Sequence, residues 1–200
     1  MSYLAAVLGG YLAGSVPTGY WLVRIFRRID IRRVGSHSIG ATNVWRAMGW
    51  KLGVPTIVVD VLKGLVPVVV ASLLVDDVAG VLAGFAAIVG HARPVFLKFE
   101  KGGKAVATTG GMMIGLAPLV ALGALIVWLV TFLVARYVSV ASMAAALSLP
   151  VFAFALAESW PVRIVTFLAA AAILFLHREN IKRLFAHREP RVQLAAMFKR

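Results

Sequence analysis

The sequence predicts an all-α integral membrane protein, and two observations lead to this fold class. Of the 200 residues, 61% are hydrophobic and only 14% are charged, whereas soluble domains carry about 25% charged residues. The apolar residues are also gathered in long runs, and about 20 such residues are enough for a helix to cross a bilayer. The chain has no cysteine, which excludes disulfides and cysteine-ligated metals. A chain of this length is expected to form one membrane-embedded domain over residues 1–200.

The apolar runs predict about seven transmembrane helical segments, one of them short or partial. The runs themselves lie at residues 3–25, 54–75, 78–96, 105–135, 138–157 and 161–176. The first is expected to be a retained helix, because basic residues follow it and no small-residue cleavage site does. Three glycines and Pro118 predict that the long run from 105 to 135 breaks into an out-and-back pair. Its first limb is then too short to span, which is tolerated where a helix lines a buried or watery cavity.

Basic residues predict the orientation, because Lys and Arg in short loops stay on the cytoplasmic side. Seven lie from Arg24 to Lys51, four from Arg93 to Lys104 and seven from Arg178 to Arg200. The opposite connections carry three acidic residues and a single arginine. We therefore expect the N-terminus outside and the C-terminus in the cytoplasm. The net charge of +13 also indicates an anionic partner.

The first inner loop, DIRRVGSHSIGATNVWRAMG from Asp30 to Gly49, is rich in glycine and hydroxyl groups. Its candidate residues are Gly35, Ser36, Ser38, Gly40, Thr42, Asn43 and Arg46. Backbone N–H groups and hydroxyls of this kind hold phosphate in many proteins. The alternative is a polar interfacial turn whose side chains satisfy one another.

The second inner loop, GHARPVFLKFEKGGKAVATTGG from Gly90 to Gly111, places Lys104 directly after two glycines. Gly102 and Gly103 allow a close approach of the backbone to a ligand. The loop is not a nucleotide P-loop, because Leu97 replaces the required glycine and Ala105 the required Ser or Thr. The alternative is a glycine turn whose lysines only anchor the chain at the membrane surface.

Three further polar features carry open alternatives. Asp60 and Lys63 lie three residues apart inside the second span, as a structural ion pair or as part of a site. The segment HREN, from His177 to Asn180, ends the last span as an interface anchor or as a substrate contact. Ser142 is expected to serve helix packing by default.

The polar loops together predict an anion pocket on the cytoplasmic face. Two function classes fit it: an enzyme acting on a phosphorylated substrate at the bilayer surface, or a transporter of a phosphorylated anion. A transporter needs inverted repeats and polar residues that continue through the bilayer. Neither is visible in the sequence, which favours the enzyme.

The motifs resemble those of the bacterial acyl-phosphate glycerol-3-phosphate acyltransferases, the PlsY family. The matching segments are GSVPTGY (14–20), GSHSIGATNVWR (35–46), DVLKG (60–64), GHARPVFLKFEKGGKAVAT (90–108) and HREN (177–180). They cover nearly the whole chain in order. The resemblance implies a seven-helix inner-membrane enzyme whose site faces the cytoplasm. It transfers an acyl group from acyl phosphate to the 1-hydroxyl of glycerol 3-phosphate, giving lysophosphatidic acid and phosphate in phospholipid synthesis.

The same resemblance implies roles for individual residues. Those that hold glycerol 3-phosphate and act in catalysis are Arg46, Lys104, Ser142, His177 and Asn180. Those that hold acyl phosphate are Gly35, Ser36, Gly40, Thr42, Asn43, Gly102 and Gly103. Those that support the site are Asp60, Lys63 and His91.

An acyl phosphate is already activated, so substrate positioning without a covalent acyl-enzyme is expected to suffice. The His-x4-Asp signature of other glycerolipid acyltransferases is absent, because Thr42, Phe96, Lys182 and Val192 stand five residues after the four histidines. We expect no cofactor, no metal and no nucleic-acid partner, and a monomer embedded in membrane lipid. Acyl-CoA or acyl carrier protein stays open as the alternative donor.

Two segments depart from the family pattern. His37 and Ser38 stand where the family has Gly-Asn, and Ala105 stands where it has glycine. Histidine tolerates a positive φ better than β-branched residues do. Ala105 is expected to extend the helix that follows it.

Overall fold

The structure is a computed structural model that describes residues 2–192, and within them it consists of helices and connecting loops only. The α-helices are α1 (Tyr3–Ser15), α2 (Thr18–Arg27), α3 (Ala41–Met48), α4 (Trp50–Leu74), α5 (Asp77–Ala92), α6 (Val106–Leu116), α7 (Pro118–Ala135), α8 (Val138–Ala155), α9 (Trp160–Leu176) and α10 (Arg178–Phe185). Short 3-10 turns lie at Ile31–Arg33 and Val95–Leu97. The all-α class is confirmed. Lys199 and Arg200, which contributed to the predicted orientation, lie outside the described residues.

The helices that could cross a membrane agree closely with the apolar runs. Of the described helices, four are long and apolar enough by themselves, namely α4, α5 (continued to Leu97), α7 and α8. A fifth candidate is α9 taken together with α10, bent by 54° between them. The predicted break in the run 105–135 is also present, because α6 ends at Leu116 and Pro118 begins α7. With 11 residues, α6 is about 16 Å long and too short to span.

The first apolar run is broken, which corrects the expectation of a single helix. α1 ends at Ser15, and α2 begins only after Pro17. Proline removes a backbone donor and clashes with the preceding turn, which favours a break here, although α4 continues through Pro55 and Pro67. The break leaves the carbonyl of Val16 accessible, and Nζ of Lys63 on α4 donates to it at 3.1 Å.

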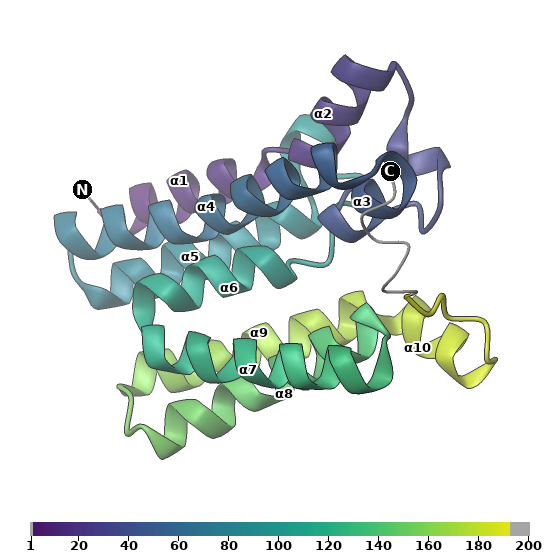
Figure 1. Cartoon of the computed structure of the whole chain (residues 1–200). Coiled ribbons are helices and arrows are strands. Elements are labelled where there is room, and N and C mark those ends of the chain that lie inside the picture. The colour runs from purple at the N-terminus through teal and green to yellow at the C-terminus, as the bar shows by residue number, and fades with distance from the viewer. Residues whose placement is uncertain (1, 193–200) are drawn as a thin grey trace.

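The helices form two layers (Figure 1). One layer contains α1, α4, α5 and α6, and the other contains α7, α8 and α9. Small residues allow close backbone contact in the first layer: a methyl group on Gly14 would overlap the carbonyl oxygen of Ala87, and one on Gly111 that of Val61. This is a common way to pack helices in a bilayer. Buried apolar side chains from both layers, such as Met112 and Val165, form the core between them.

The polar and basic loops gather at one end of the bundle. The hydroxyl of Tyr3 donates to Asp76, which places the start of α1 beside the α4–α5 connection. At the opposite end lie α3, the connection from α5 to α6, and α10 (Figure 1). The two glycine-containing loops and the HREN segment therefore reach the same end of the molecule.

Candidate functional site

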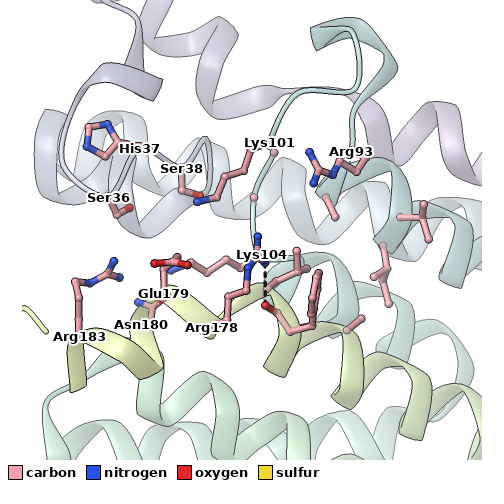
Figure 2. Close-up of a pocket in the computed structure, with 18 of the residues that line it drawn as sticks. Ser36, His37, Ser38, Arg93, Lys101, Lys104, Arg178, Glu179, Asn180 and Arg183 are labelled. Atoms are coloured by element: carbon pink, nitrogen blue, oxygen red, sulfur yellow. Dashed lines mark hydrogen bonds between the residues drawn. The ribbon is translucent and has the colours of Figure 1, made fainter. Parts of the chain in front are cut away.

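A cleft of about 510 Å³ opens between the two layers at the basic end. Its apolar lining comes from α5 and α9, through Phe85, Ile88, Val89, Ala92, Ala172, Phe175 and Leu176. Its polar lining comes from the two loops and α10, through Ser36, His37, Ser38, Arg93, Lys101, Gly102, Gly103, Lys104, Arg178, Glu179, Asn180 and Arg183. Figure 2 shows Lys104 between Ser36–Ser38 on one side and α10 on the other. The surplus of cations around the cleft suits an anionic ligand.

Asn43 holds the first loop in shape. Its Oδ1 accepts a hydrogen bond from the N–H of Ser36 at 2.9 Å, and its Nδ2 donates to the carbonyls of Ser38 at 2.8 Å and Val34 at 3.0 Å. Gly35 has φ +63°, and a methyl group there would overlap Asn43 Oδ1. The side-chain amide of Asn43 is thus hydrogen-bonded within the loop itself.

The first departure from the family pattern lies at a position that requires a left-handed backbone. His37 has φ +57°, as glycine would favour, and its Nδ1 lies 2.9 Å from the carbonyl oxygen of Arg32. Its neighbour Ser38 is buried, and Ser38 Oγ accepts from the N–H of Gly40 at 3.2 Å. Both His37 and Ser38 line the cleft.

The second loop is fastened to the end of α5. The N–H of Gly102 donates to the carbonyl of Ala92 at 3.0 Å, and that of Gly103 to His91 at 3.1 Å. Gly103 also lies beside the first loop, since a methyl group on Gly40 would come within 4.0 Å of its Cα. Lys104 follows immediately, so both predicted loops converge on this lysine.

Ala105 does not extend α6, which corrects our expectation. It has φ +58° and ψ 12°, and the helix begins only at Val106. An alanine in this left-handed conformation is strained by about 1–2 kcal/mol, so the family's glycine at this position has a conformational reason.

We expect Ala105→Gly to be nearly neutral, because relief of the strain offsets loss of the buried methyl group, worth about 0.8 kcal/mol. Ala105→Val is expected to destabilise the protein by about 2 kcal/mol or more, since a β-branched residue tolerates neither the positive φ nor the buried site. Thermal unfolding of both variants in detergent checks this. Equal melting temperatures for the two variants would contradict it.

His177 joins α9 to α10 and is buried. Its Nδ1 lies 2.8 Å from the carbonyl oxygen of Ile173. A carbonyl can only accept, so Nδ1 carries the hydrogen and a neutral ring keeps Nε2 as an acceptor. His177 itself is outside the set of described residues that line the cleft, whereas its predicted partner Asn180 is within that set.

Other predicted site residues lie beside the cleft rather than in its lining. Ser142 on α8 is buried, and its Oγ accepts from Nε1 of Trp128 on α7 at 3.2 Å. Arg46 on α3 donates to the carbonyl of Pro190 at 3.4 Å. Of the residues predicted to hold acyl phosphate, those outside the described lining are Gly35, Gly40, Thr42 and Asn43.

The structure adds Glu189, which sequence reasoning missed. Its Oε1 accepts from Asn180 Nδ2 and Ser139 Oγ, each at 2.7 Å, and its Oε2 accepts from Arg183 Nε at 2.8 Å. Burial acts to raise the pKa of Glu189, but these hydrogen bonds lower it below its usual value. Nδ2 of Asn180 is used in this way, whereas its Oδ1 is a buried acceptor that has no partner within residues 2–192. An acidic residue in the strongly basic segment after α10 was the only available signal in the sequence.

Lys104 has an altered proton affinity. Burial lowers its pKa to about 8, the attraction of Glu189 opposes this shift, and the nearby cations Arg183, Arg46 and Lys101 add to it. Lys104 is therefore mostly charged at pH 7 and loses its proton just above pH 8.

This pKa predicts a pH dependence. We expect kcat/KM for a phosphorylated substrate to fall above pH 8, by up to about tenfold per unit, as Lys104 becomes neutral. Ionisation of the substrate phosphate does not alter the rate in this pH range, because its second pKa is about 6 and it is already fully charged. In a Lys104→Arg variant, kcat/KM should not fall between pH 8 and pH 10, whatever its absolute value, since arginine keeps its charge. Initial rates from pH 6 to 10 measure this, and parallel falls in both proteins would assign the ionisation elsewhere.

Asp60 and Lys63 form an ion pair of 2.7 Å, and both side chains are buried. Nδ1 of His91 lies 3.8 Å from Asp60 Oδ1. All three are outside the described lining of the cleft, and the ring of His91 packs against Gly103 of the second loop. Within residues 2–192, no group of three or more His, Asp or Glu side chains could hold a metal ion.

The sequence is similar to known proteins along nearly its whole length. The family model for glycerol-3-phosphate acyltransferase matches residues 4–187. The glycerol-3-phosphate acyltransferase of Geotalea daltonii is 45% identical over 185 residues, which cover 92% of this chain and 94% of that protein. The enzyme of the same name from Geobacillus kaustophilus is 43% identical over 187 residues, covering 94% of each.

Two solved structures share the fold. One is a crystal structure of PlsY (YgiH), an integral membrane glycerol 3-phosphate acyltransferase, in its glycerol 3-phosphate form, with a TM-score of 0.92 and 40% identity. The other is the lysophosphatidic acid form, with a TM-score of 0.90 and 38% identity. Each alignment covers 98% of both chains. The family match and these identities over almost the full length show that this chain belongs to the glycerol-3-phosphate acyltransferase family.

Proposed function

We propose that this acyltransferase uses acyl phosphate as donor and acylates the 1-hydroxyl of glycerol 3-phosphate, releasing lysophosphatidic acid and inorganic phosphate. The observation that carries the proposal is the composition of the cleft. A cationic polar mouth adjoins an apolar wall from α5 and α9, which suits a phosphorylated head group joined to an acyl chain. The solved relatives in glycerol 3-phosphate and lysophosphatidic acid forms support the acceptor and the product.

In this proposal the second loop and α10 hold the acceptor. Lys104 binds the phosphate of glycerol 3-phosphate, and the unpartnered Oδ1 of Asn180 accepts a hydrogen bond from one of its hydroxyls. The residues that complete the acceptor site beside the cleft are Arg46, Ser142 and His177. The donor phosphate lies against the first loop and Gly102–Gly103, where Ser36 lines the cleft and Gly35, Gly40, Thr42 and Asn43 shape the cradle.

The reaction needs positioning more than it needs a strong base. The acceptor hydroxyl oxygen attacks the acyl carbon, the bond from that carbon to the phosphate oxygen breaks, and phosphate leaves. The hydroxyl proton passes to a phosphate oxygen of one of the two substrates. Lys104 and the loop N–H groups offset the developing negative charge, which together with alignment accounts for most of the acceleration. His91 and Asp60 do not act as a catalytic dyad here, because Asp60 is paired with Lys63.

His177 is assigned a binding role. His177→Ala is expected to raise KM for glycerol 3-phosphate about tenfold and to change kcat much less, because one hydrogen bond to a charged ligand is lost. Steady-state kinetics with acceptor varied at saturating donor measure both constants. A collapse of kcat with KM unchanged would instead identify His177 as the proton acceptor.

One experiment separates the donors. Purified protein in detergent is given glycerol 3-phosphate with palmitoyl phosphate, palmitoyl-CoA or palmitoyl carrier protein, and lysophosphatidic acid and phosphate are both measured. Product formed only from palmitoyl phosphate supports the proposal. Product formed only from a thioester overturns the donor and keeps the acyltransferase. Failure of all three donors in well-folded protein would reopen the transport of a phosphorylated anion.

We also propose the orientation: seven membrane segments, α1–α2, α4, α5, α6, α7, α8 and α9, with the N-terminus outside and the cleft facing the cytoplasm of a bacterial inner membrane, as a monomer. The support is the concentration of basic residues at the end that carries the cleft. Because the chain has no cysteine, single cysteines at Asp77 and Arg188 report cleanly. An impermeant maleimide on intact cells should label Asp77→Cys only, and light scattering in detergent should give the monomer mass.

A further inference from the structure

The imidazole ring of His91 fills the place that a side chain at position 103 would need. His91 is 3% exposed and lies in the last turn of α5. A methyl group built on Gly103 would overlap its Nε2 and lie 2.7 and 2.9 Å from its Cε1 and Cδ2. The ring therefore packs directly against the backbone that precedes Lys104.

Buried charged residues lie next to the ring of His91 on the side away from Gly103. Nδ1 of His91 lies 3.8 Å from Oδ1 of Asp60, and Asp60 is paired with Lys63 at 2.7 Å. Lys63 in turn donates to the carbonyl of Val16 at the break between α1 and α2. Nδ1 of His91 has no hydrogen-bond partner within the described residues, so the ring is kept in place by close packing against this buried ion pair, which is costly to disturb.

We propose that His91 is a positioning residue whose ring sets the height of the Gly103 backbone and thereby places the amino group of Lys104 in the cleft. The hydrogen bonds from Gly102 and Gly103 hold the loop against the end of α5, and the ring of His91 limits how closely the loop can approach. This inference rests on the proposed role of Lys104 in binding glycerol 3-phosphate. A shift of about 1 Å at such a group is enough to cost two orders of magnitude in rate.

Gly102 supplies a matched control. A methyl group on Gly102 would overlap the backbone carbonyl of His91 and lie 2.9 Å from Cδ of Pro94. Neither Gly102 nor Gly103 has a positive φ, so backbone conformation admits alanine at both. Different parts of His91 thus exclude a side chain at the two positions. The ring excludes one at Gly103, and the main-chain carbonyl excludes one at Gly102.

The test is a set of double variants. Gly103→Ala and Gly102→Ala are each expected to lower kcat/KM for glycerol 3-phosphate about 100-fold, because the loop must move. His91→Ala should raise KM about tenfold with little change in kcat, since the lysine loses its placement. Adding His91→Ala to Gly103→Ala should recover at least tenfold of the lost activity, because the ring that clashes is gone. Adding it to Gly102→Ala should recover nothing.

Three results would overturn the proposal: full activity of Gly103→Ala, no recovery in its double variant, or equal recovery in both double variants, which would indicate general loosening of the loop. Melting temperatures of all variants are measured in parallel, and His91→Asn, which lacks the ring, replaces His91→Ala if the latter does not fold. Absence of acceptor-dependent turnover in the unmodified protein would instead be a failure of the proposed function. In that case the melting temperatures still test the contact between the ring and Gly103. Adding His91→Ala should raise the melting temperature of Gly103→Ala but not that of Gly102→Ala.

Discussion

Lys104→Ala is expected to lower kcat/KM for glycerol 3-phosphate by about 100- to 1,000-fold, the largest effect on activity that we predict. Lys104 lies between the two halves of the cleft (Figure 2) and is a cation held in a largely buried setting. Removing a preorganised charge from such a place forfeits stabilisation that water cannot replace. The measurement is the initial rate of phosphate and lysophosphatidic acid formation from palmitoyl phosphate.

Lys98→Ala is the matched control, because Lys98 belongs to the same connection but is exposed and outside the cleft lining. Its kinetics should equal those of the unmodified protein. Lys104→Arg is not expected to restore full activity, since the guanidinium is larger and planar. If Lys104→Ala kept more than about a tenth of the activity, the acceptor phosphate would have to bind elsewhere in the cationic mouth.

Glu189→Ala is expected to have the largest effect on stability, about 3 kcal/mol or more, and to lower kcat/KM by less than Lys104→Ala does. The carboxylate is the shared acceptor of Asn180, Ser139 and Arg183, and removing one partner leaves buried donors and a cation uncompensated. Asn180 then loses the hydrogen bond that fixes the orientation of its side-chain amide. Thermal unfolding in detergent and acceptor kinetics together measure the loss.

Glu179→Ala serves as the control for stability, because Glu179 is a partly exposed residue of α10 whose carboxylate pairs with the exposed Lys182. It should leave the melting temperature unchanged. The pKa of Glu189 is lowered in the folded state, so its stabilisation is present at neutral pH and is lost as the pH falls through that pKa. Glu189→Gln should therefore show less additional destabilisation in acid than the unmodified protein, and an unchanged acid response would contradict this assignment.

Local sequence determined most of the helices. Apolar runs predicted α4, α8 and α9 to within a few residues, and Pro118 predicted the break between α6 and α7, because run length and proline act on the chain without tertiary help. The break at Pro17 does not follow from the proline alone, because α4 continues through Pro55 and Pro67 and α8 through Pro150. α3 and α10 were missed because each is only eight residues long, amphipathic and stabilised by packing at the end of the bundle rather than by an apolar run.

The candidate site divides in the same way. Motifs and their resemblance to a family brought forward Lys104, Asn180, Ser36 and the two glycines, all of which line the cleft. Asn43 was assigned to a ligand, whereas its amide is engaged by its own loop. A hydrogen-bond partner seven residues away cannot be inferred from residue type alone.

By itself, therefore, the sequence determined the membrane class, most of the helix lengths and the chemistry available at the basic end of the bundle, because these depend on composition, periodicity and local backbone preference. Only the tertiary structure decided which groups support others. Glu189 contacts Asn180 and Ser139 on two different helices, and the ring of His91 packs against Gly103 in the loop that carries Lys104. Such contacts depend on how distant segments pack, and packing is a property of the whole chain rather than of any one motif.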